Sequence, residues 1–243
     1  MAPRVALFVT CIVDQIFPDT GEAVVELLVA QGVQVDFPMA QTCCGQPGFN
    51  SGYQDESRAV ARHFLKVFAA YDAIVTPSGS CAAMVRHFYP ELFKDQPELA
   101  LAQTVAAKTW EFTQYLVDVL HITRLGTSLP KPATAAIHDA CHGLRGLGLG
   151  AQSRALLGQV GNLTLTPLAG NDQCCGFGGL FAVKMSEISG AMLKDKLLSI
   201  EAAGVDFIIT GDASCLMHMN GGLSRQGSAR RVVHIAEVLA GRV

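Results

Sequence analysis

The sequence has few charged residues, no run of basic residues and no hydrophobic stretch long enough to span a membrane. Charged residues make up 16% of the 243 positions, and 18 basic against 21 acidic residues leave a formal charge of −3. Because nucleic-acid binding usually rests on a clustered basic surface, this balance argues against a nucleic-acid partner. A membrane-spanning helix needs roughly 18 consecutive apolar residues, and no segment approaches that length.

A cleavable leader is not indicated either. Residues 5–13 are apolar and follow Arg4, but no small-residue cleavage site comes after them. We interpret this stretch as a buried first strand and expect a cytoplasmic protein, or one peripheral to the inner membrane face. Half of the residues are hydrophobic and the mean hydropathy is +0.31, which excludes intrinsic disorder. The length suits one large domain or two small ones.

Common cofactor signatures are missing as well. The glycines at 143, 146, 148 and 150 do not form GxGxxG after a strand, and there is no P-loop. The short C-x2-4-C knuckles of structural zinc sites are also absent. The sequence therefore shows no fingerprint of a nicotinamide or flavin cofactor.

The chain does contain eight cysteines, and they form two similar sets. They are about 3% of the residues, below the level of small disulfide scaffolds, and in a reducing compartment such pairs favour metal binding or redox chemistry. The first set has the spacing C-x31-CC-x36-C and the second has C-x32-CC-x39-C. The cysteines are Cys11, Cys43, Cys44 and Cys81, then Cys141, Cys174, Cys175 and Cys215.

The residues around the cysteines repeat too. Residues 43–48 and 174–179 both read CCGxxG, and residues 72–81 match 206–215 at a constant offset of 134. This internal repeat predicts two homologous halves. We predict a first repeat over 1–96, a helical insertion and linker over 97–132 that includes Trp110, Leu116 and Leu120, and a second repeat over 133–243.

Each half alternates short apolar strands with helices. In the first half, strands are predicted over 4–10, 33–37 and 72–76, and helices over 22–30 and 54–70. In the second half, strands are predicted over 134–138, 163–168 and 206–210, and helices over 153–160 and 181–202. Short apolar strands between helices are typical of parallel sheets. The predicted fold class is α/β, with two homologous half-domains whose parallel sheets are flanked by helices and related by a pseudo-twofold axis.

The predicted strand ends bring the cysteines of each half together. Cys11 and Cys141 follow a first strand, the vicinal pairs follow a second, and Cys81 and Cys215 follow a third at a helix start. Because the carboxyl ends of parallel strands meet at one edge of a sheet, the four thiols are expected to converge. Four thiolates are the ligand set of a [4Fe–4S] cluster. All eight cysteines are therefore predicted metal and cofactor ligands, for one or two clusters.

Other interpretations stay open. The cysteines could be buried structural residues, as free cysteines often are, or one half could hold a four-thiolate zinc ion. His138, His142 and His218 lie near the second set in sequence and are the candidate catalytic residues. Taken singly, each is interpreted as a hydrogen-bond donor near the ligands or as a packed core residue rather than as a ligand.

Around the CCGxxG segments the sequence resembles the cysteine-rich CCG-domain family, in two copies that cover almost the whole chain. That family includes a cysteine-rich subunit of heterodisulfide reductase, the iron-sulfur subunit of glycolate oxidase and proteins of lactate utilisation. CCGQPGFNSG (43–52), HDACHGLRGLG (138–148), CCGFGGLFAVKMSEIS (174–189) and SCLMHMNGGL (214–223) are most similar to the last of these. The resemblance implies an oxidoreductase, namely a cytoplasmic iron-sulfur subunit of an L-lactate oxidising complex. The implied partners are a second iron-sulfur subunit and a third small subunit, with a small 2-hydroxy acid as substrate.

One position in each half departs from the family pattern. The heterodisulfide reductase relative has a fifth cysteine three residues after the last one of each set, where this chain has Met84 and His218. That difference argues against a non-cubane cluster and against heterodisulfide cleavage. In some relatives one CCG half binds zinc. The resemblance therefore also allows a zinc- or cluster-stapled scaffold that assembles the complex without electron transfer.

Overall fold

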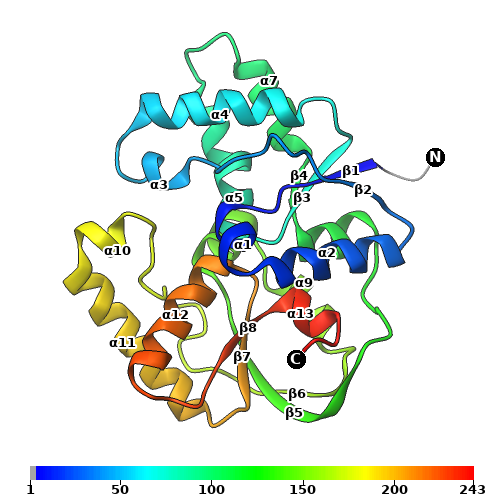
Figure 1. Cartoon of the computed structure of the whole chain (residues 1–243), viewed down its shortest axis with the longest axis vertical. Helices are drawn as coiled ribbons and strands as arrows, with labels where there is room; N and C mark the ends of the chain where they lie inside the picture. The colour runs from blue at the N-terminus through cyan, green and yellow to red at the C-terminus, as the bar shows by residue number, and fades with distance from the viewer. Residues whose placement is uncertain (1–3) are drawn as a thin grey trace.

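The computed structural model describes residues 4–243 as two parallel β-sheets of four strands each, covered by helices (Figure 1). The strand orders are equivalent, β2-β1-β3-β4 in the first sheet and β6-β5-β7-β8 in the second. Neighbouring strands within each sheet run parallel. The predicted α/β fold with two homologous halves is confirmed.

The first half is built around two short strands that are buried on both faces. These are β1 (Arg4–Leu7) and β3 (Ala73–Thr76), with β2 (Gln34–Asp36) and β4 (Thr109–Glu111) at the edges. Near-continuous apolar sequence suits a central parallel strand, because helices cover both of its faces. The helical elements are α1 (Cys11–Ile16), α2 (Pro18–Ala30), α3 (Gln46–Phe49), α4 (Gln54–Phe68), α5 (Gly79–Ala83), η1 (Met84–Phe88), α6 (Tyr89–Leu92), α7 (Leu99–Ala107), α8 (Phe112–Gln114) and η2 (Tyr115–Val119).

The second half repeats this plan. Its central strands are β5 (Ser128–His138) and β7 (Phe207–Thr210), with β6 (Gly161–Leu165) and β8 (Val232–His234) at the edges. The helical elements are η3 (His142–Gly146), α9 (Ala151–Leu157), α10 (Phe181–Lys184), α11 (Ser186–Ala203), α12 (Ala213–Arg225) and α13 (Ile235–Leu239). The helix predicted over 181–202 is thus divided at Met185 into a short and a long helix.

The two halves share one hydrophobic core. A single cluster of buried residues joins the inner faces of both sheets and includes Leu7 of β1 and Ile137 of β5. In this inner layer α2 of the first half packs against α13 of the second, and Figure 1 shows the two helices beside each other. The outer faces have separate cores, formed with α4 in the first half and with α11 and α12 in the second. The shared layer therefore fixes how the two sheets face each other.

An isolated antiparallel bridge between Ser78 and Asp212 joins the carboxyl edges of the two sheets. These two residues are equivalent in the repeat, because they differ by the same offset of 134 as the surrounding segments. Contact between equivalent residues is what a twofold relation between two copies produces. The loops that follow β1, β3, β5 and β7 are thereby brought to a common region.

Residues 97–132 contribute more to the fold than the predicted helical insertion and linker. Trp110 lies on β4, which pairs with β3 and completes the first sheet. Leu116 is helical, as predicted, within η2, and β5 already begins at Ser128. The strands β4 and β8 were not predicted, because each is short and runs directly into a helix, α8 and α13 respectively, so that no turn marks its end. The predicted boundaries at 96 and 133 stay predictions.

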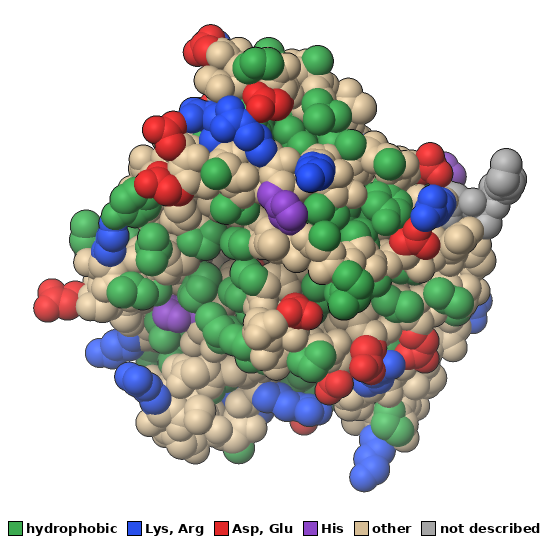
Figure 2. Space-filling view, turned by 45° about the horizontal axis from the view of Figure 1, so that its top comes forward, with side chains coloured by type: hydrophobic (Ala, Val, Ile, Leu, Met, Phe, Trp, Pro, Cys, Tyr) green, Lys and Arg blue, Asp and Glu red, His purple; other side chains and the backbone are tan. Residues whose placement is uncertain are grey.

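Within residues 4–243, no helix combines the length and the apolar character that crossing a bilayer requires. The face drawn in Figure 2 carries acidic and basic side chains scattered among hydrophobic ones. Charges of both signs are interspersed there, so this face has no continuous basic area of the kind that nucleic-acid binding uses.

Candidate metal centre

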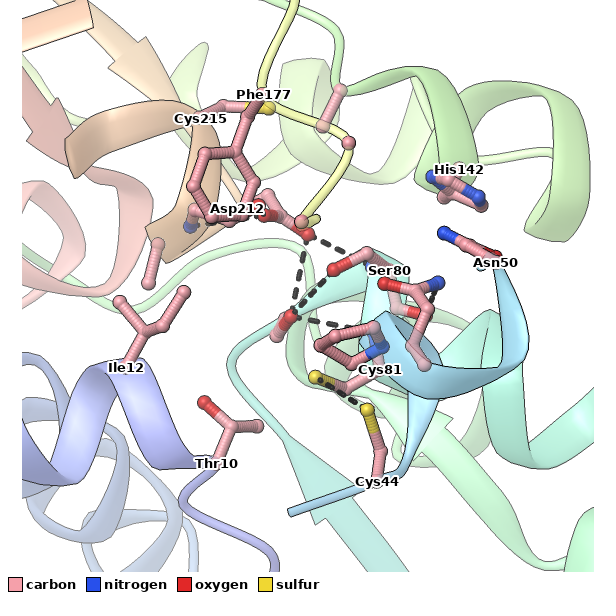
Figure 3. Close-up of a pocket in the computed structure, with 18 of the residues that line it drawn as sticks. Thr10, Ile12, Cys44, Asn50, Ser80, Cys81, His142, Phe177, Asp212 and Cys215 are labelled. Carbon is pink, nitrogen blue, oxygen red and sulfur yellow. Dashed lines mark hydrogen bonds between the residues drawn. The ribbon is translucent and has the colours of Figure 1, made fainter. Parts of the chain in front are cut away.

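All eight cysteines line one cavity between the two halves. The cavity has a volume of about 120 Å³ and is also lined by Thr10, Asn50, His142, Phe177 and Asp212. Figure 3 shows these side chains converging on it from both halves of the chain. The sequence predicted one group of thiols at each sheet edge, and the structure places both groups around the same cavity.

The first four thiols form an outer pair and an inner pair. Cys11 is the first residue of α1, and Cys43 lies in the loop after β2; their Sγ atoms are 3.9 Å apart. The Sγ atoms of Cys44 and Cys81 lie 3.4 Å apart and are buried, whereas Cys11 is exposed. Figure 3 shows Cys44 and Cys81 pointing toward each other. Cys81 lies in the first turn of α5, where its N–H donates to the capping hydroxyl of Ser78.

The second four thiols repeat this arrangement. Cys141 directly precedes η3, and its Sγ lies 4.0 Å from that of Cys174. The Sγ atoms of Cys175 and Cys215 lie 3.3 Å apart, and both residues are buried. The two sets therefore match in fold position, in pairing and in the order of exposure from the outer to the inner pair.

Each vicinal pair combines a strongly acidic thiol with one that holds its proton. Hydrogen bonds from two neighbouring thiols and from a backbone N–H lower the pKa of Cys43 to about 3 and that of Cys174 to about 2. Interaction with neighbouring thiols, followed by burial, raises the pKa of Cys44 and of Cys175. Because metals bind thiolates, one ligand per set is ready and the others would release protons on binding.

The glycine of each CCG segment is required by the backbone conformation. Gly45 and Gly176 have φ values of +82° and +93°, which residues with a side chain rarely adopt. Their N–H groups donate to the preceding Sγ atoms of Cys43 and Cys174, at 3.4 and 3.3 Å. A Cβ on Gly176 would also lie 2.6 Å from the carbonyl oxygen of Ser189. The tight turn thus directs a backbone donor at a candidate ligand sulfur.

Two of the three predicted histidines lie beside the second set of thiols. His138, at the end of β5, is buried, and a ring nitrogen lies within 4.8 Å of the Sγ atoms of Cys175 and Cys215. Burial lowers the pKa of His138 to about 4, so its ring is neutral at pH 7. His142 Nδ1 lies 3.7 Å from the Sγ of Cys141.

The third histidine, His218, makes a different contact. Its Nε2 lies 3.5 Å from Ser189 Oγ, and its ring packs edge-on against Phe177, with the ring centroids 5.7 Å apart. Met84, the equivalent residue in the first half, is fully buried in the outer core of that half. The structure therefore places His218 in packing against Phe177, a residue that lines the cavity.

Sequence reasoning missed Asp212, which connects the two thiol sets. Its carboxylate accepts hydrogen bonds from Ser80 N–H of the first half at 2.8 Å and from Ser214 N–H of the second at 3.1 Å. Ser78 Oγ of the first half adds a third bond at 3.2 Å, and Ser214 Oγ donates a fourth. Figure 3 shows Asp212 bonded across the halves to Ser80. Burial opposes its ionisation, but bonds from both halves outweigh burial and lower the pKa of Asp212. One buried carboxylate thus joins the helix starts that carry Cys81 and Cys215.

A second, smaller cavity lies behind the second thiol set. It is lined by Glu111, His138 and Thr210, and each has a buried polar atom without a hydrogen-bond partner among the described residues. The other oxygen of Glu111 accepts from the N–H groups of Thr113 and Gln114. Burial, with a contribution from Asp212, raises the pKa of Glu111 to about 7. The carboxyl group is therefore only partly ionised near neutral pH.

Glu111 gives a testable pH dependence of stability. Its raised pKa means that the folded chain holds a proton which the unfolded chain loses near pH 4.5. The contribution to stability is therefore full below pH 4.5 and is lost as the pH rises to about 7. The loss is up to about 3 kcal/mol in the free energy of unfolding. Denaturant unfolding of the metal-free, reduced chain between pH 4.5 and 7.5 measures it.

The variant Glu111→Gln should lack this part of the pH dependence, because an amide does not titrate but its oxygen can accept the same two backbone bonds. Glu56→Gln, on the exposed side of α4, controls for the substitution itself. A Glu111→Gln curve that runs parallel to that of the unchanged chain over this pH range would contradict the assignment.

Comparison with known proteins agrees with the repeat. A model of a family described as a cysteine-rich domain, CCG, matches residues 5–86 and 135–220. The chain is 50% identical to Lactate utilization protein A of an Exiguobacterium species, over 98% of this chain and 97% of that protein. It is 48% identical to the protein of the same name from Geobacillus kaustophilus, over 98% and 99%. The Bacillus cereus protein of that name is 47% identical, with the same coverage.

Similarity to solved structures is weaker. Glutamate racemase RacE1 from Bacillus anthracis aligns over 98% of this chain and 79% of its own length, at 13% identity and a TM-score of 0.36, too low to support an argument about fold or function.

The two segments that match the family model each contain a complete four-cysteine set, and the relatives named above align over nearly their full lengths. The chain therefore belongs to the cysteine-rich CCG-domain family, together with the Lactate utilization protein A sequences.

Proposed function

We propose that this chain is an iron-sulfur redox subunit of a complex that oxidises L-lactate or a related 2-hydroxy acid. The observation that carries the proposal is the meeting of two equivalent four-thiol sets at one cavity between the halves. Four thiolates per set are the ligands of a [4Fe–4S] cluster, which supplies one-electron transfer when bound. The names of the full-length relatives supply lactate as the substrate of the system.

The spacing of the thiols does not match a single ion bound by all four sulfurs of a set. A tetrahedral zinc ion with bonds of about 2.3 Å would hold its four sulfurs about 3.8 Å apart. Among the described residues, no three thiols of one set lie within 4.8 Å of one another, although each set contains two close pairs. The four sulfurs of a set therefore do not surround one point as a single tetrahedral ion requires, and a core with one sulfur on each metal atom would need the sulfurs of each pair to move apart.

In this proposal the residues of the chain have distinct tasks. The eight cysteines hold the metal, and the N–H groups of Gly45 and Gly176 donate to the outer sulfurs. Oxidation of the hydroxyl-bearing carbon of lactate to a carbonyl releases a pair of electrons and a pair of protons. Two centres at one cavity allow the electrons to be taken up singly, while the hydride- or carbanion-accepting step belongs to a partner. Two further subunits, at least one of them an iron-sulfur protein, are the proposed partners.

One observation favours a second candidate, a zinc-stapled scaffold that assembles the complex without electron transfer. His138, Cys175 and Cys215 present donor atoms that all lie within 4.8 Å of one another. That spacing suits a single ion, and zinc accepts nitrogen and sulfur ligands together. The candidate applies to the second half, because the equivalent of His138 in the first half is Phe8.

Metal analysis separates the two candidates. We expect the anaerobically purified chain to be brown and to contain about eight iron atoms and eight acid-labile sulfides, as two cubane clusters require. Iron, sulfide and zinc are counted in the same sample, and lactate-dependent electron transfer is measured after the complex is assembled from its subunits. A fully active complex in which this chain holds zinc without sulfide would exclude electron transfer through the chain and support the scaffold.

A further inference from the structure

The two halves differ in the side chains that lie behind their thiols. Phe8 and His138 occupy equivalent positions, each three residues before the first cysteine of its set. Both are buried at the end of the first strand of their sheet. The first half thus has an aromatic ring where the second has a polar one, although the thiols themselves are arranged alike.

A second pair of equivalent positions differs more strongly. Ser57 on α4 and Ser189 on α11 each donate a hydrogen bond to the carbonyl oxygen of the CCG glycine in their half. Seven residues further along these helices stand Phe64 and Lys196. Both side chains are buried, with exposures of 2% and 1%. A lysine in the second half therefore replaces a core phenylalanine of the first.

The first half uses its two positions for aromatic packing. Phe8 and Phe64 meet edge to face, with ring centroids 4.9 Å apart. Phe68 and Tyr89 pack on the same ring of Phe64, at 4.3 and 5.4 Å. Such contacts leave an apolar environment behind the first set of thiols.

The second half places an ammonium group in the same layer. Lys196 Nζ donates to the carbonyl oxygen of Gly170, in the loop that leads to the second CCG segment. Burial lowers the pKa of Lys196, while Cys175, Cys215 and Asp172 act in the opposite direction. A buried cation is costly unless anionic groups compensate it. Asp172 and the cysteines of the second set, once they bind metal as thiolates, would supply that negative charge.

A fixed positive charge next to a redox centre stabilises the more negative, reduced state of that centre. Asp172 offsets part of this effect. Asp139 is paired with Arg154, and Asp212, whose charge acts on Cys141 and Cys215, is held by hydrogen bonds from both halves. The first set has Phe64 and Phe8 at the equivalent positions. Lys196 is thus a buried cation of the second half at a position where the first half has an uncharged ring.

We propose that Lys196 raises the reduction potential of the second metal centre above that of the first. The second half is then the electron-accepting end of the chain. This inference rests on the proposed function, because it requires a redox-active centre in each half. It adds a direction of electron flow, from the aromatic-backed first set to the lysine-backed second set, across the shared cavity.

A redox titration monitored by electron paramagnetic resonance tests the proposal on the full, anaerobically loaded chain. The variants Cys44→Ser and Cys175→Ser identify which signal belongs to which half. We expect the second centre to have the higher midpoint potential. Lys196→Met should change the ratio of its reduced to oxidised forms about tenfold at a fixed potential, a lowering of about 59 mV for one electron. The first centre should not move.

Three further variants make the result specific. Phe64→Met puts methionine at the equivalent position of the first half and should leave the second centre unchanged. Lys196→Gln keeps a donor for the carbonyl of Gly170 without the charge, so it should lower the potential as Lys196→Met does even if methionine disturbs packing. Lys196→Arg keeps the charge and should preserve the higher potential.

Iron and sulfide counts on each variant distinguish a failure of the proposed function from a failure of the inference about Lys196. If the unchanged chain carries no iron-sulfur centre, the proposed function fails, and the inference fails with it. If both centres are present but Lys196→Met and Lys196→Gln leave the second potential in place, or if the first centre has the higher potential, Lys196 does not direct electrons and only the inference is overturned.

Discussion

Replacing Cys175 by serine is expected to remove the metal of the second half while leaving that of the first half in place. Cys175 is buried beside Cys215. Because its site is enclosed, a thiol from the surface cannot replace it as a ligand. A serine hydroxyl is a far weaker ligand for iron than a thiolate, because it stays protonated near neutral pH. We expect about half of the iron and sulfide to be lost, and lactate-dependent turnover of the assembled complex to fall by about 100-fold or more.

Cys44→Ser is the matched variant, since Cys44 occupies the equivalent position in the first half. It should remove the other half of the metal and leave the spectrum that Cys175→Ser removes. Circular dichroism and gel filtration of both variants establish that the fold persists. The assignment of separate centres would be wrong if either substitution emptied both halves, or if both variants kept the full metal content.

Asp212→Ala is expected to be the most destabilising substitution at the junction of the two halves. It removes the acceptor of four hydrogen bonds, from the N–H and the Oγ of Ser214, from Ser80 N–H and from Ser78 Oγ. Asp212 is buried, so these donors would be left without a partner. A lost helix cap and an unsatisfied buried donor each weigh about 1–2 kcal/mol, which gives a fall of about 3 kcal/mol in the free energy of unfolding.

The structure offers Ser78→Ala as the control. Ser78 is the repeat equivalent of Asp212, but it makes only the cap of its own helix and one of the bonds to Asp212, so its loss should lower stability less, by about 1 kcal/mol. Both variants are compared with the unchanged chain by denaturant unfolding without metal and under reducing conditions. A destabilisation by Asp212→Ala no larger than that by Ser78→Ala would show that the other bonds of the carboxylate, including the cross-half bond from Ser80 N–H, contribute little.

The duplication explains why so much of the fold is predictable. Two copies of one pattern specify the strand–helix alternation twice, and the cysteines mark the ends of strands in both. The strands β4 and β8 were not predicted because each runs directly into a helix, whereas the equally short β2 is followed by a loop. The helical spacing around Trp110 predicts a helix there, whereas pairing of β4 with β3 decides its conformation. A tertiary contact overrides the local pattern at that point.

The site is predictable in its ligands and less so in its surroundings. Proximity in sequence places three histidines near the second set, but only the backbone direction decides that His138 faces the thiols while His218 packs on Phe177. Asp212 bonds to Ser80, 132 positions away, and no local signal reports such a contact. Lys196 lies in α11 among other charged residues, so the sequence does not predict that its side chain is buried. Only the packing of α11 against the sheet shows this.

The inner layer that both sheets share has a consequence for how such a chain could have arisen. A protein with only one repeat would expose the apolar face that α2 and α13 cover together, and exposed patches of that size favour association. Its simplest remedy is an isologous homodimer, in which the residues equivalent to Ser78 and Asp212 meet on the symmetry axis. Joining two such subunits in one chain frees each copy to diverge. A buried lysine in one copy, at the position where the other copy has a phenylalanine, is a difference that a symmetric dimer could not have.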